Sequence, residues 1–390
     1  MFKLLNEVRG LVGLTGKMVR QMKLGMETTT QTIVSGLAIS TACIMPLSNA
    51  AVAAGHSGSA GVGSGISGSA RASGAGVSGA VGAASAKVAN PAAVLPGAEG
   101  DDEGSNDFDD DAKAATSPLK SLLRQASRER IFILPGSAEL AQAEQLFVQL
   151  LQGKLDPQSP KARAAANALA LDLQTVGGLT VLVEQAGARR GRGFFAFRPG
   201  EQSQDVLQVP HSFKDEMTRD IGLALFQEGH FAAVAFNTVP RRFPGANGQE
   251  VVADMAHIDG TYFLAFTRAT AKVLAQGRTV QIHGFDQGKR KSAALADTDV
   301  ILSAGHASPP ASLRQSRALL EKRLQRTVAL YADGARELGA TTNVEAAALR
   351  ALGYAQFIHV EMSRAMRSLM RDDAATRKIW LASIMNGGSA

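Results

Sequence analysis

The chain has 390 residues, and its 41 Lys and Arg residues outnumber its 35 Asp and Glu residues, for a formal net charge of +6 at pH 7. The basic residues are scattered and aromatic residues make up only 5% of the chain, which excludes a nucleic-acid surface built on a basic patch with stacking aromatics. Cys43 is the only cysteine, so internal disulfides are excluded as well.

Residues 1–53 have the pattern of an export signal. Basic residues between Lys3 and Lys23 precede an apolar stretch over 33–45, which is too short to span a bilayer comfortably. Small residues around Ala50 and Ala53 follow, as they do at a cleavage site. We therefore expect a periplasmic or secreted protein that has no permanent membrane span and, once Cys43 is removed, no cysteine nucleophile.

Residues 54–116 are predicted to form a disordered linker. Nearly every residue up to about position 100 is Gly, Ala, Ser or Val, which leaves too little side chain to offset the entropy of ordering the chain. An acidic run over 101–111 extends this linker. The ordered domain is then expected over 117–390.

Amphipathic and short apolar runs alternate along this domain. In chain order we predict helices at 138–152 and 164–176, strands at 179–185, 193–197 and 206–210, a helix at 215–228, a strand at 231–236, a helix at 255–275, strands at 279–282 and 300–303, helices at 313–331 and 344–352, a strand at 356–360 and a helix at 374–384. The turn at 191–193 precedes no helix, so it is predicted to close a hairpin and not to bind phosphate. The alternation predicts an α/β domain with a central, mostly parallel or mixed sheet flanked by helices on both faces.

Two histidines follow predicted strands. His211 comes directly after the strand at 206–210, and His283 comes after the strand at 279–282. Ligands of open α/β sheets bind at the carboxyl ends of strands. Two histidines and one carboxylate, with a fourth position left to water, are the usual ligands of a catalytic zinc ion. We therefore predict one zinc ion held by His211, His283 and either Asp215 or Glu216.

A carboxylate and several arginines are candidates for the chemistry beside this metal. Glu361 lies in an otherwise apolar strand, where a buried carboxylate is costly and is usually retained for a partner or a reaction. We predict that it acts as the general base toward the attacking water. Arg241, Arg242 or Arg364 is expected to hold a substrate carboxylate or to stabilise the oxyanion.

Two other histidines have alternative interpretations. His257 follows Asp254 by one turn of the predicted helix, so it either contacts the substrate, oriented by Asp254, or belongs only to the start of the helix. His359 shares one face of its strand with Glu361, because the two positions are two residues apart. It either supports the metal or packs.

Residues 206–367 resemble the zinc amidohydrolases and carboxypeptidase-like enzymes, a group that includes N-formylglutamate amidohydrolase and the phage-type poly-γ-glutamate hydrolases. The spacing from His211 to Glu216 resembles the first ligand pair of the poly-γ-glutamate hydrolases, and the strand that ends in His283 resembles their later histidine strand. The segment around Glu361 is similar to the strand with their catalytic glutamate, and the three motifs come in the same order. The resemblance implies a central mixed sheet, one zinc ion and hydrolysis of an amide bond next to a carboxylate.

The chain also departs from this group. Metallocarboxypeptidases use His-x-x-Glu, whereas here Asp215 competes with Glu216 for the carboxylate position. No Gly-x-Ser-x-Gly elbow lies between a strand and a helix, which argues against a serine hydrolase. We predict an enzyme that hydrolyses a small peptide, a γ-glutamyl compound or an N-acyl amino acid outside the cytoplasm. The alternative is a non-catalytic, envelope-associated binding or structural domain on a long tether.

Overall fold

The computed structural model describes residues 117–385. The predicted export signal at 1–53 and the predicted linker at 54–116 lie outside the described residues. Among the helices of residues 117–385, none is both long enough and apolar enough to cross a membrane.

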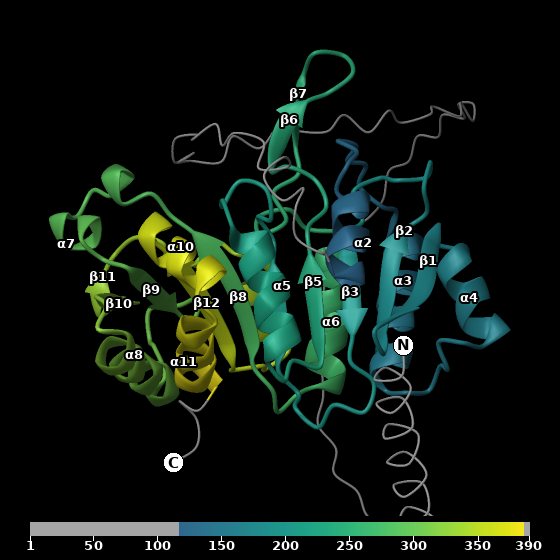
Figure 1. The fold of residues 1–390 in the computed structure, drawn as a ribbon. Helices are drawn as coiled ribbons and strands as arrows, with labels where there is room; N and C mark the ends of the chain where they lie inside the picture. Colours follow the sequence, from purple (N-terminus) through teal and green to yellow (C-terminus); the bar gives the residue numbers. More distant parts are fainter. Residues whose placement is uncertain (1–116, 386–390) are drawn as a thin grey trace, which may run out of the picture. The chain divides into compact units, whose positions relative to one another are not determined.

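A ten-stranded sheet forms the centre of the described domain (Figure 1). The neighbouring strands β5, β4, β8 and β12 are parallel, as are β9, β10 and β11. The pairs β1–β2, β2–β3, β3–β5 and β12–β9 are antiparallel. The sheet is therefore mixed and mostly parallel, which confirms the predicted fold class. From edge to edge the strands are β1 (Leu171–Val176), β2 (Leu179–Glu184), β3 (Phe194–Phe197), β5 (Ala233–Phe236), β4 (Val206–Val209), β8 (Thr279–Gly284), β12 (Phe357–Met362), β9 (Val300–Ser303), β10 (Val328–Tyr331) and β11 (Gly334–Ala335).

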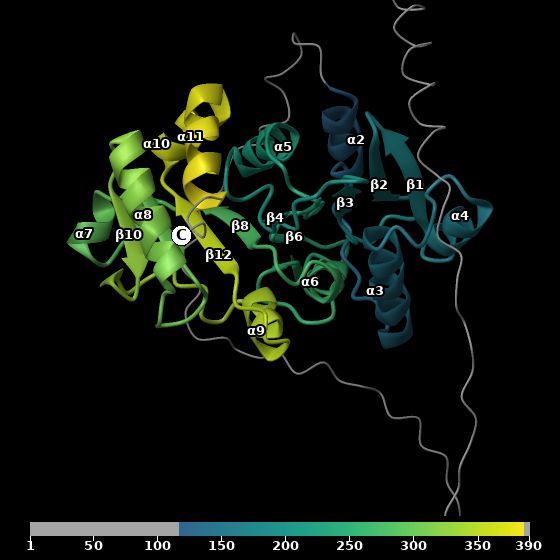
Figure 2. The same cartoon turned by 90° about the horizontal axis from the view of Figure 1, so that it is seen from below.

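Helices cover both faces of the sheet (Figure 2). The first face is covered by α2 (Pro118–Ala126), α5 (Thr218–Glu228), α8 (Ala311–Leu324), α10 (Arg364–Asp372) and α11 (Ala374–Met385). The second face is covered by α3 (Ser137–Leu151), α4 (Pro160–Asn167), α6 (Tyr262–Val273) and α9 (Val344–Ala351). Smaller elements lie in the loops: the hairpin of β6 (Arg242–Pro244) and β7 (Glu250–Val252), the 3-10 turn at Gln287–Lys289 and α7 (Ala293–Ala296).

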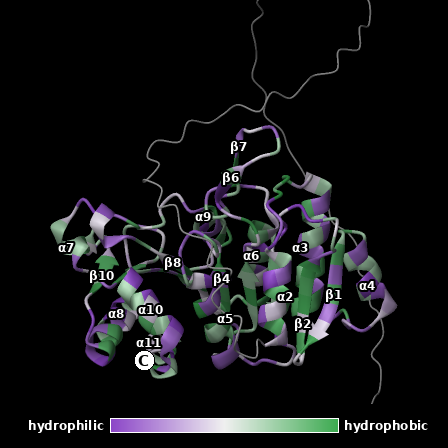
Figure 3. Ribbon diagram, turned by 45° about the horizontal axis from the view of Figure 1, so that its top comes forward, coloured by the Kyte–Doolittle hydropathy of each residue, from purple (hydrophilic) through white to green (hydrophobic). Residues whose placement is uncertain are grey.

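Each face of the sheet has its own hydrophobic core because successive strand residues point to opposite faces. The first core packs α5, α10 and α11 against the sheet and includes the fully buried Trp380. The second core packs α3 and α6 through a group of aromatic rings, in which Phe147 lies 4.7 Å from Phe195 between ring centroids. At the edge of the sheet the hydrophobic character decreases: Figure 3 shows that β2 is hydrophobic, whereas the outer strand β1 has hydrophobic and hydrophilic residues.

The middle strands break the apolar pattern on the second face only. On the first face β4, β8 and β12 carry Leu, Val, Ile and Met. On the second face they carry buried polar side chains: Gln208, Gln281, His283, His359 and Glu361. The register places Gln208 beside Gln281 and His283 beside Glu361, so these polar side chains form one continuous row.

Most predicted elements are confirmed to within a few residues, but the helix predicted at 164–176 is wrong in its second half. The helix α4 ends at Asn167, Ala170 adopts a left-handed φ of 54°, and β1 begins at Leu171. The chain then returns into β2 through a two-residue turn in which Gly177 and Gly178 both have positive φ. The Ala-rich sequence concealed the change from helical to alternating periodicity, although a Gly-Gly pair between two alternating runs is typical of a tight hairpin.

Two other predicted helices are too long. The helix predicted at 313–331 ends at Leu324, where Gln325 has a left-handed φ of 53°, and the strand β10 follows. The helix predicted at 255–275 begins only at Tyr262, because Thr261 accepts a hydrogen bond from the amide of Leu264 and caps it there. The helices α2 and α10 and the short strands β6, β7 and β11 were not predicted.

Candidate metal centre

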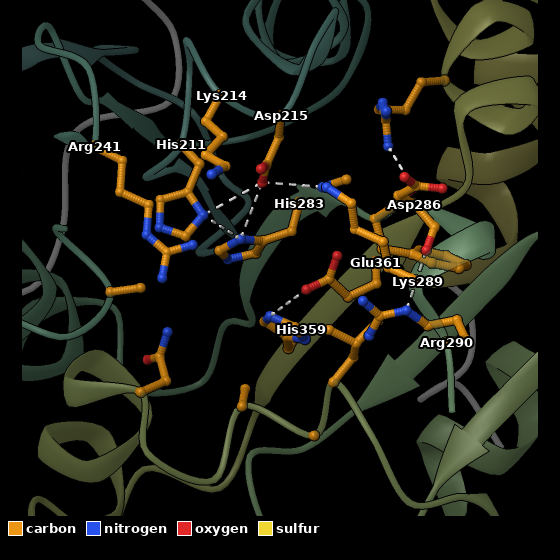
Figure 4. Close-up of a pocket in the computed structure, with 18 of the residues that line it drawn as sticks. His211, Lys214, Asp215, Arg241, His283, Asp286, Lys289, Arg290, His359 and Glu361 are labelled. Atoms are coloured by element: carbon orange, nitrogen blue, oxygen red, sulfur yellow. Dashed lines mark hydrogen bonds and ion pairs between the residues drawn. The ribbon is translucent and has the colours of Figure 1, made fainter. Parts of the chain in front are cut away.

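The proposed site lies where three adjacent parallel strands end. The strands β4, β8 and β12 have their carboxyl ends at the same edge of the sheet, and a cavity of about 610 Å³ lies there (Figure 4). His211 comes just after β4, while His283 and Glu361 are the next-to-last residues of β8 and β12. All three side chains line the cavity.

The turn between β4 and α5 places Asp215 next to His211. The Asp215 amide donates to the His211 carbonyl at 3.1 Å, and the Thr218 hydroxyl donates to the Asp215 carbonyl at 2.7 Å. The Asp215 carboxylate also accepts a hydrogen bond from the Gly284 amide at 3.0 Å. This contact ties the carboxylate to the end of β8, directly after His283.

Three potential metal ligands converge at this point. The Nδ1 atoms of His211 and His283 are 3.0 Å apart, and Asp215 Oδ2 lies 3.3 Å from the first and 3.4 Å from the second. Ligand atoms at the corners of a tetrahedron with zinc bonds of roughly 2.05 Å are separated by about 3.3 Å. The three distances therefore match three ligands of one metal ion, and all three side chains are buried.

The opposite nitrogen of each histidine ring is already engaged. His211 Nε2 donates to Asp254 Oδ1 at 3.0 Å, and the other oxygen of Asp254 accepts from Arg241 Nε at 2.6 Å. His283 Nε2 lies 2.9 Å from Gln281 Oε1. Metal-binding histidines characteristically donate their second nitrogen in this way, which leaves the other nitrogen to the metal.

The charges of the site are strongly coupled. Although burial lowers the pKa of His211, the carboxylates of Asp215 and Asp254 outweigh it and raise that pKa to about 9. The same attraction to His211 outweighs burial at Asp215 and holds its pKa far below the usual range. Burial lowers the pKa of His283 to about 4, so this ring is neutral at pH 7. A proton on His211 thus supplies the positive charge that a divalent cation would replace.

Glu361 and His359 extend the row of polar side chains away from these ligands. Glu361 is the backbone neighbour of His283 in the β8–β12 ladder, and His359 Nε2 lies 3.6 Å from Glu361 Oε1. The rings of His283 and His359 lie 4.5 Å apart between centroids. Within residues 117–385, Glu361 Oε2 has no hydrogen-bond partner. Burial, and then the charge of Asp215, raise the pKa of Glu361 to about 8.

The walls of the cavity are rich in cations. The side chain of Arg290 is only 4% exposed; it donates to the Asp286 carbonyl at 3.1 Å and pairs with Glu337 at 3.4 Å. Arg367 lies against Gly284, where a Cβ atom would come within 2.3 Å of its guanidinium. The six Lys and Arg residues that line the cavity are Lys214, Arg241, Lys289, Arg290, Arg364 and Arg367.

The predicted carboxylate and arginine candidates have different positions in the structure. Asp215 converges with the two histidines, whereas Glu216 lines the cavity and pairs with Arg364 at 3.2 Å. Arg241 lines the cavity, but Arg242 does not and pairs with Glu250 across the β6–β7 hairpin at 2.7 Å. Consecutive residues of an extended chain point to opposite sides, so only one of these two arginines faces the site.

His257 lines the cavity and lies in a turn, outside the helix that the sequence predicted over 255–275. The turn joins it to Asp254, because the His257 amide donates to the Asp254 carbonyl at 3.0 Å. The Asp254 carboxylate instead pairs with His211 and Arg241. Burial, the largest influence, lowers the pKa of His257.

The sequence did not indicate several residues that support the site. The sequence points to Asp254 only as a partner for His257, because a loop position gives no periodic signal. A signal for Gln281 does exist: its position two residues before His283 places both side chains on one face of the strand. Asn343 and Arg290, which come from two different loops, also line the cavity.

No protein-family model and no curated protein matches this chain. Among solved structures, the described fold has distant similarity to the gene product Atu2144 from Agrobacterium tumefaciens, with 11% identity, a TM-score of 0.32 and coverage of 48% of this chain and 89% of the other. It is also distantly similar to an aspartoacylase family protein from Mesorhizobium loti, with 13% identity, a TM-score of 0.30 and coverage of 56% and 69%. Because both likenesses are distant, the functional conclusions below depend on the geometry of the site.

Proposed function

We propose that this protein is a zinc-dependent hydrolase whose metal is held by His211 Nδ1, His283 Nδ1 and a carboxylate oxygen of Asp215. The convergence of these three buried atoms at 3.0 to 3.4 Å is the observation that carries the proposal. Two imidazoles and one carboxylate suit zinc, and a set of only three protein ligands is typical of catalytic sites, in which a fourth position is left for water or substrate.

The residues around this site have distinct roles in the proposed reaction. Bound zinc supplies a Lewis acid and makes water a better nucleophile near neutral pH. The pKa of about 8 keeps Glu361 protonated at pH 7 in the metal-free site, and the charge of a bound divalent cation would favour its ionised form. The ionised carboxylate, whose Oε2 is unpartnered among the described residues, could then accept the proton of the attacking water and return it to the leaving amine in the cavity that Glu361 lines. Arg241 is held by Asp254 beside His211, where a guanidinium stabilises the negative charge that develops on the carbonyl oxygen.

The cationic walls favour an anionic substrate. Six Lys and Arg side chains line the cavity, against four Asp and Glu, one of which is the proposed ligand Asp215. We therefore propose that the substrate has a carboxylate next to the scissile amide, as small peptides, γ-glutamyl compounds and N-acyl amino acids do. Action outside the cytoplasm is part of the same proposal and depends on the predicted export signal at 1–53.

The test is the metal content of the purified full-length chain. We expect about one zinc per chain, and loss of that zinc from the His211→Ala/His283→Ala double variant. His230→Ala is the matched control, because the side chain of His230 is exposed and lies outside the cavity lining. The proposal is ruled out if elemental analysis finds no divalent metal in the unaltered protein even after zinc is supplied.

Activity is tested with paired substrates. A peptide or N-acyl amino acid with a free carboxylate should be hydrolysed, and the same compound with that carboxylate converted to an amide should react far more slowly. Zinc binding without hydrolysis of any such compound would instead support the alternative of a non-catalytic binding domain.

A further inference from the structure

A chain of buried hydrogen bonds leads from the helix α6 to the ring of His283. The Thr267 hydroxyl donates to the Phe263 carbonyl at 3.0 Å, and the Gln208 amide nitrogen donates to the Thr267 hydroxyl at 2.8 Å. The Gln281 amide nitrogen donates to Gln208 Oε1 at 3.0 Å, and Gln281 Oε1 lies 2.9 Å from His283 Nε2. Three elements, α6, β4 and β8, thus contribute one side chain each behind the proposed ligand.

The direction of this chain is determined at its far end. The Phe263 carbonyl only accepts hydrogen bonds, so the Thr267 hydroxyl uses its single proton there and must accept from Gln208. Gln208 therefore presents its nitrogen to Thr267 and its oxygen to Gln281. Gln281 in turn directs its nitrogen to Gln208, and its oxygen faces His283.

A second anchor fixes the Gln281 amide independently. Asn343 caps the helix α9, and its Oδ1 accepts from the Ala346 amide at 2.8 Å. A backbone amide only donates, so the Asn343 nitrogen must point the other way, and it donates to Gln281 Oε1 at 2.7 Å. Both anchors make Gln281 Oε1 the acceptor that faces His283.

Burial makes the opposite arrangement costly. Thr267, Gln208 and Gln281 are fully buried and Asn343 is 2% exposed. Exchanging the oxygen and nitrogen positions of one of these side-chain amides would place two acceptors or two donors against each other, where water does not reach. Each buried polar group left without a hydrogen bond in this way costs roughly 1–3 kcal/mol.

We infer that Gln281 is a positioning residue that fixes the proton of His283 on Nε2 and leaves the lone pair of Nδ1 directed at the metal position before any metal binds. The hydrogen-bond chain through Gln208 to Thr267, together with Asn343, holds Gln281 in the orientation that does this. The effect on metal affinity rests on the proposed zinc site, but the protonation of the metal-free ring does not.

The first measurement is the position of the His283 proton in the metal-free, full-length protein, read from long-range ¹H–¹⁵N NMR correlations at pH 7.5. We expect the proton on Nε2. A proton on Nδ1 in the unaltered protein would overturn the inference, whether or not the protein binds zinc.

The second measurement compares two matched substitutions on the same helix. Thr267→Val removes the hydroxyl at the far end of the hydrogen-bond series. Thr270→Val makes the same change at another fully buried threonine of α6 that takes no part in this series. We expect a mixture of His283 tautomers and about tenfold weaker zinc binding in Thr267→Val. Thr270→Val and Thr267→Ser, which keeps the hydroxyl, should behave like the unaltered protein.

A third variant acts at the second anchor. Asn343→Asp keeps a good helix cap but replaces the donor to Gln281 with an acceptor, so it should shift the His283 proton in the same way. If Thr267→Val and Asn343→Asp both leave the tautomer and the zinc affinity unchanged, the inference fails even though the zinc site stands. Failure of the unaltered protein to bind zinc would count against the proposed function and not against the hydrogen-bond chain.

Discussion

Glu361 differs from the proposed ligands because one of its carboxylate oxygens has no partner among the described residues. Glu361→Gln keeps the size of the side chain but cannot accept the proton of water. We expect full zinc content and a fall in kcat of about 10²- to 10⁴-fold, measured on a carboxylate-bearing amide substrate. Unchanged turnover in this variant would remove Glu361 from the reaction.

The structure also distinguishes the two neighbouring carboxylates. Asp215 lies within 3.4 Å of both histidine nitrogens, whereas Glu216 pairs with Arg364 at the cavity wall. Asp215→Asn should therefore weaken zinc binding by more than about 100-fold, beyond the effect of losing a group that only supports a ligand. Glu216→Gln should leave the zinc dissociation constant within about threefold of the original. The reverse ranking in a chelator competition assay would make Glu216 the ligand.

Glu345 provides a test of pH dependence at a buried carboxyl group that is not a proposed ligand, although its Oε2 accepts from the Gln281 amide nitrogen at 3.4 Å. Burial raises its pKa to about 8, above the value of 4.5 that an unfolded chain would have. Between these values the folded state keeps a proton that the unfolded state has lost, so this group makes the free energy of unfolding fall by roughly 1.4 kcal/mol per pH unit as pH rises. Glu345→Gln should remove this pH-dependent fall in the free energy of unfolding, because glutamine does not ionise. Urea unfolding at pH 5 and pH 8 should show the variant gaining stability relative to the unaltered protein only at the higher pH.

At the scale of elements, the close approach of α5 to the sheet depends on Gly222. A Cβ atom at this position would lie 2.6 Å from a methyl group of Val209 and 3.1 Å from the ring of Phe236. Gly222→Ala should therefore lower the free energy of unfolding by about 1–3 kcal/mol, although alanine by itself favours a helix. Gly136→Ala is the control, since a Cβ there meets nothing within 4 Å. Thermal unfolding that ranks the two variants equally would contradict this account of the packing.

The sequence predicted elements well where one periodicity continued between clear boundaries. The apolar runs of β2, β8 and β9 and the amphipathic pattern of α3 gave nearly the observed ranges. Predictions failed where a helical pattern passed into a strand with no Gly or Pro between them, as at Ala170 and Gln325. Both residues adopt a left-handed backbone, which non-glycine residues seldom do and which their sequence does not announce.

The candidate site was predictable in part for a similar reason. His211, His283 and Glu361 follow or end apolar strands, a pattern that sequence alone reveals. The partners of these residues come from loops distant in the sequence: Asp254 lies 43 residues from His211, and Asn343 lies 62 residues from Gln281. Only the three-dimensional fold brings such loops together.

At the scale of the whole molecule, metal binding should be coupled to folding. His211, Asp215 and His283 lie on two different segments of the chain, so a bound ion links β8 to the turn after β4 in the folded state only. A ligand that binds only the folded state at 100 times its dissociation constant stabilises it by about 2.7 kcal/mol.

Chelation of zinc should therefore lower the melting temperature of the full-length chain, and added zinc should restore it, as measured by scanning calorimetry. The His211→Ala/His283→Ala double variant should show no response to either treatment. A response of equal size in that variant would place the stabilising metal elsewhere in the chain.

The pairing of β8 with β12 has an evolutionary consequence. Because His283 faces Glu361 across a backbone ladder, the loss or gain of a single residue within either strand would turn one of them to the opposite face of the sheet. The tip of the β6–β7 hairpin is under no such constraint. We therefore expect related sequences to differ in length at 245–249, and to keep the two strands free of insertions and deletions even where their residues have changed.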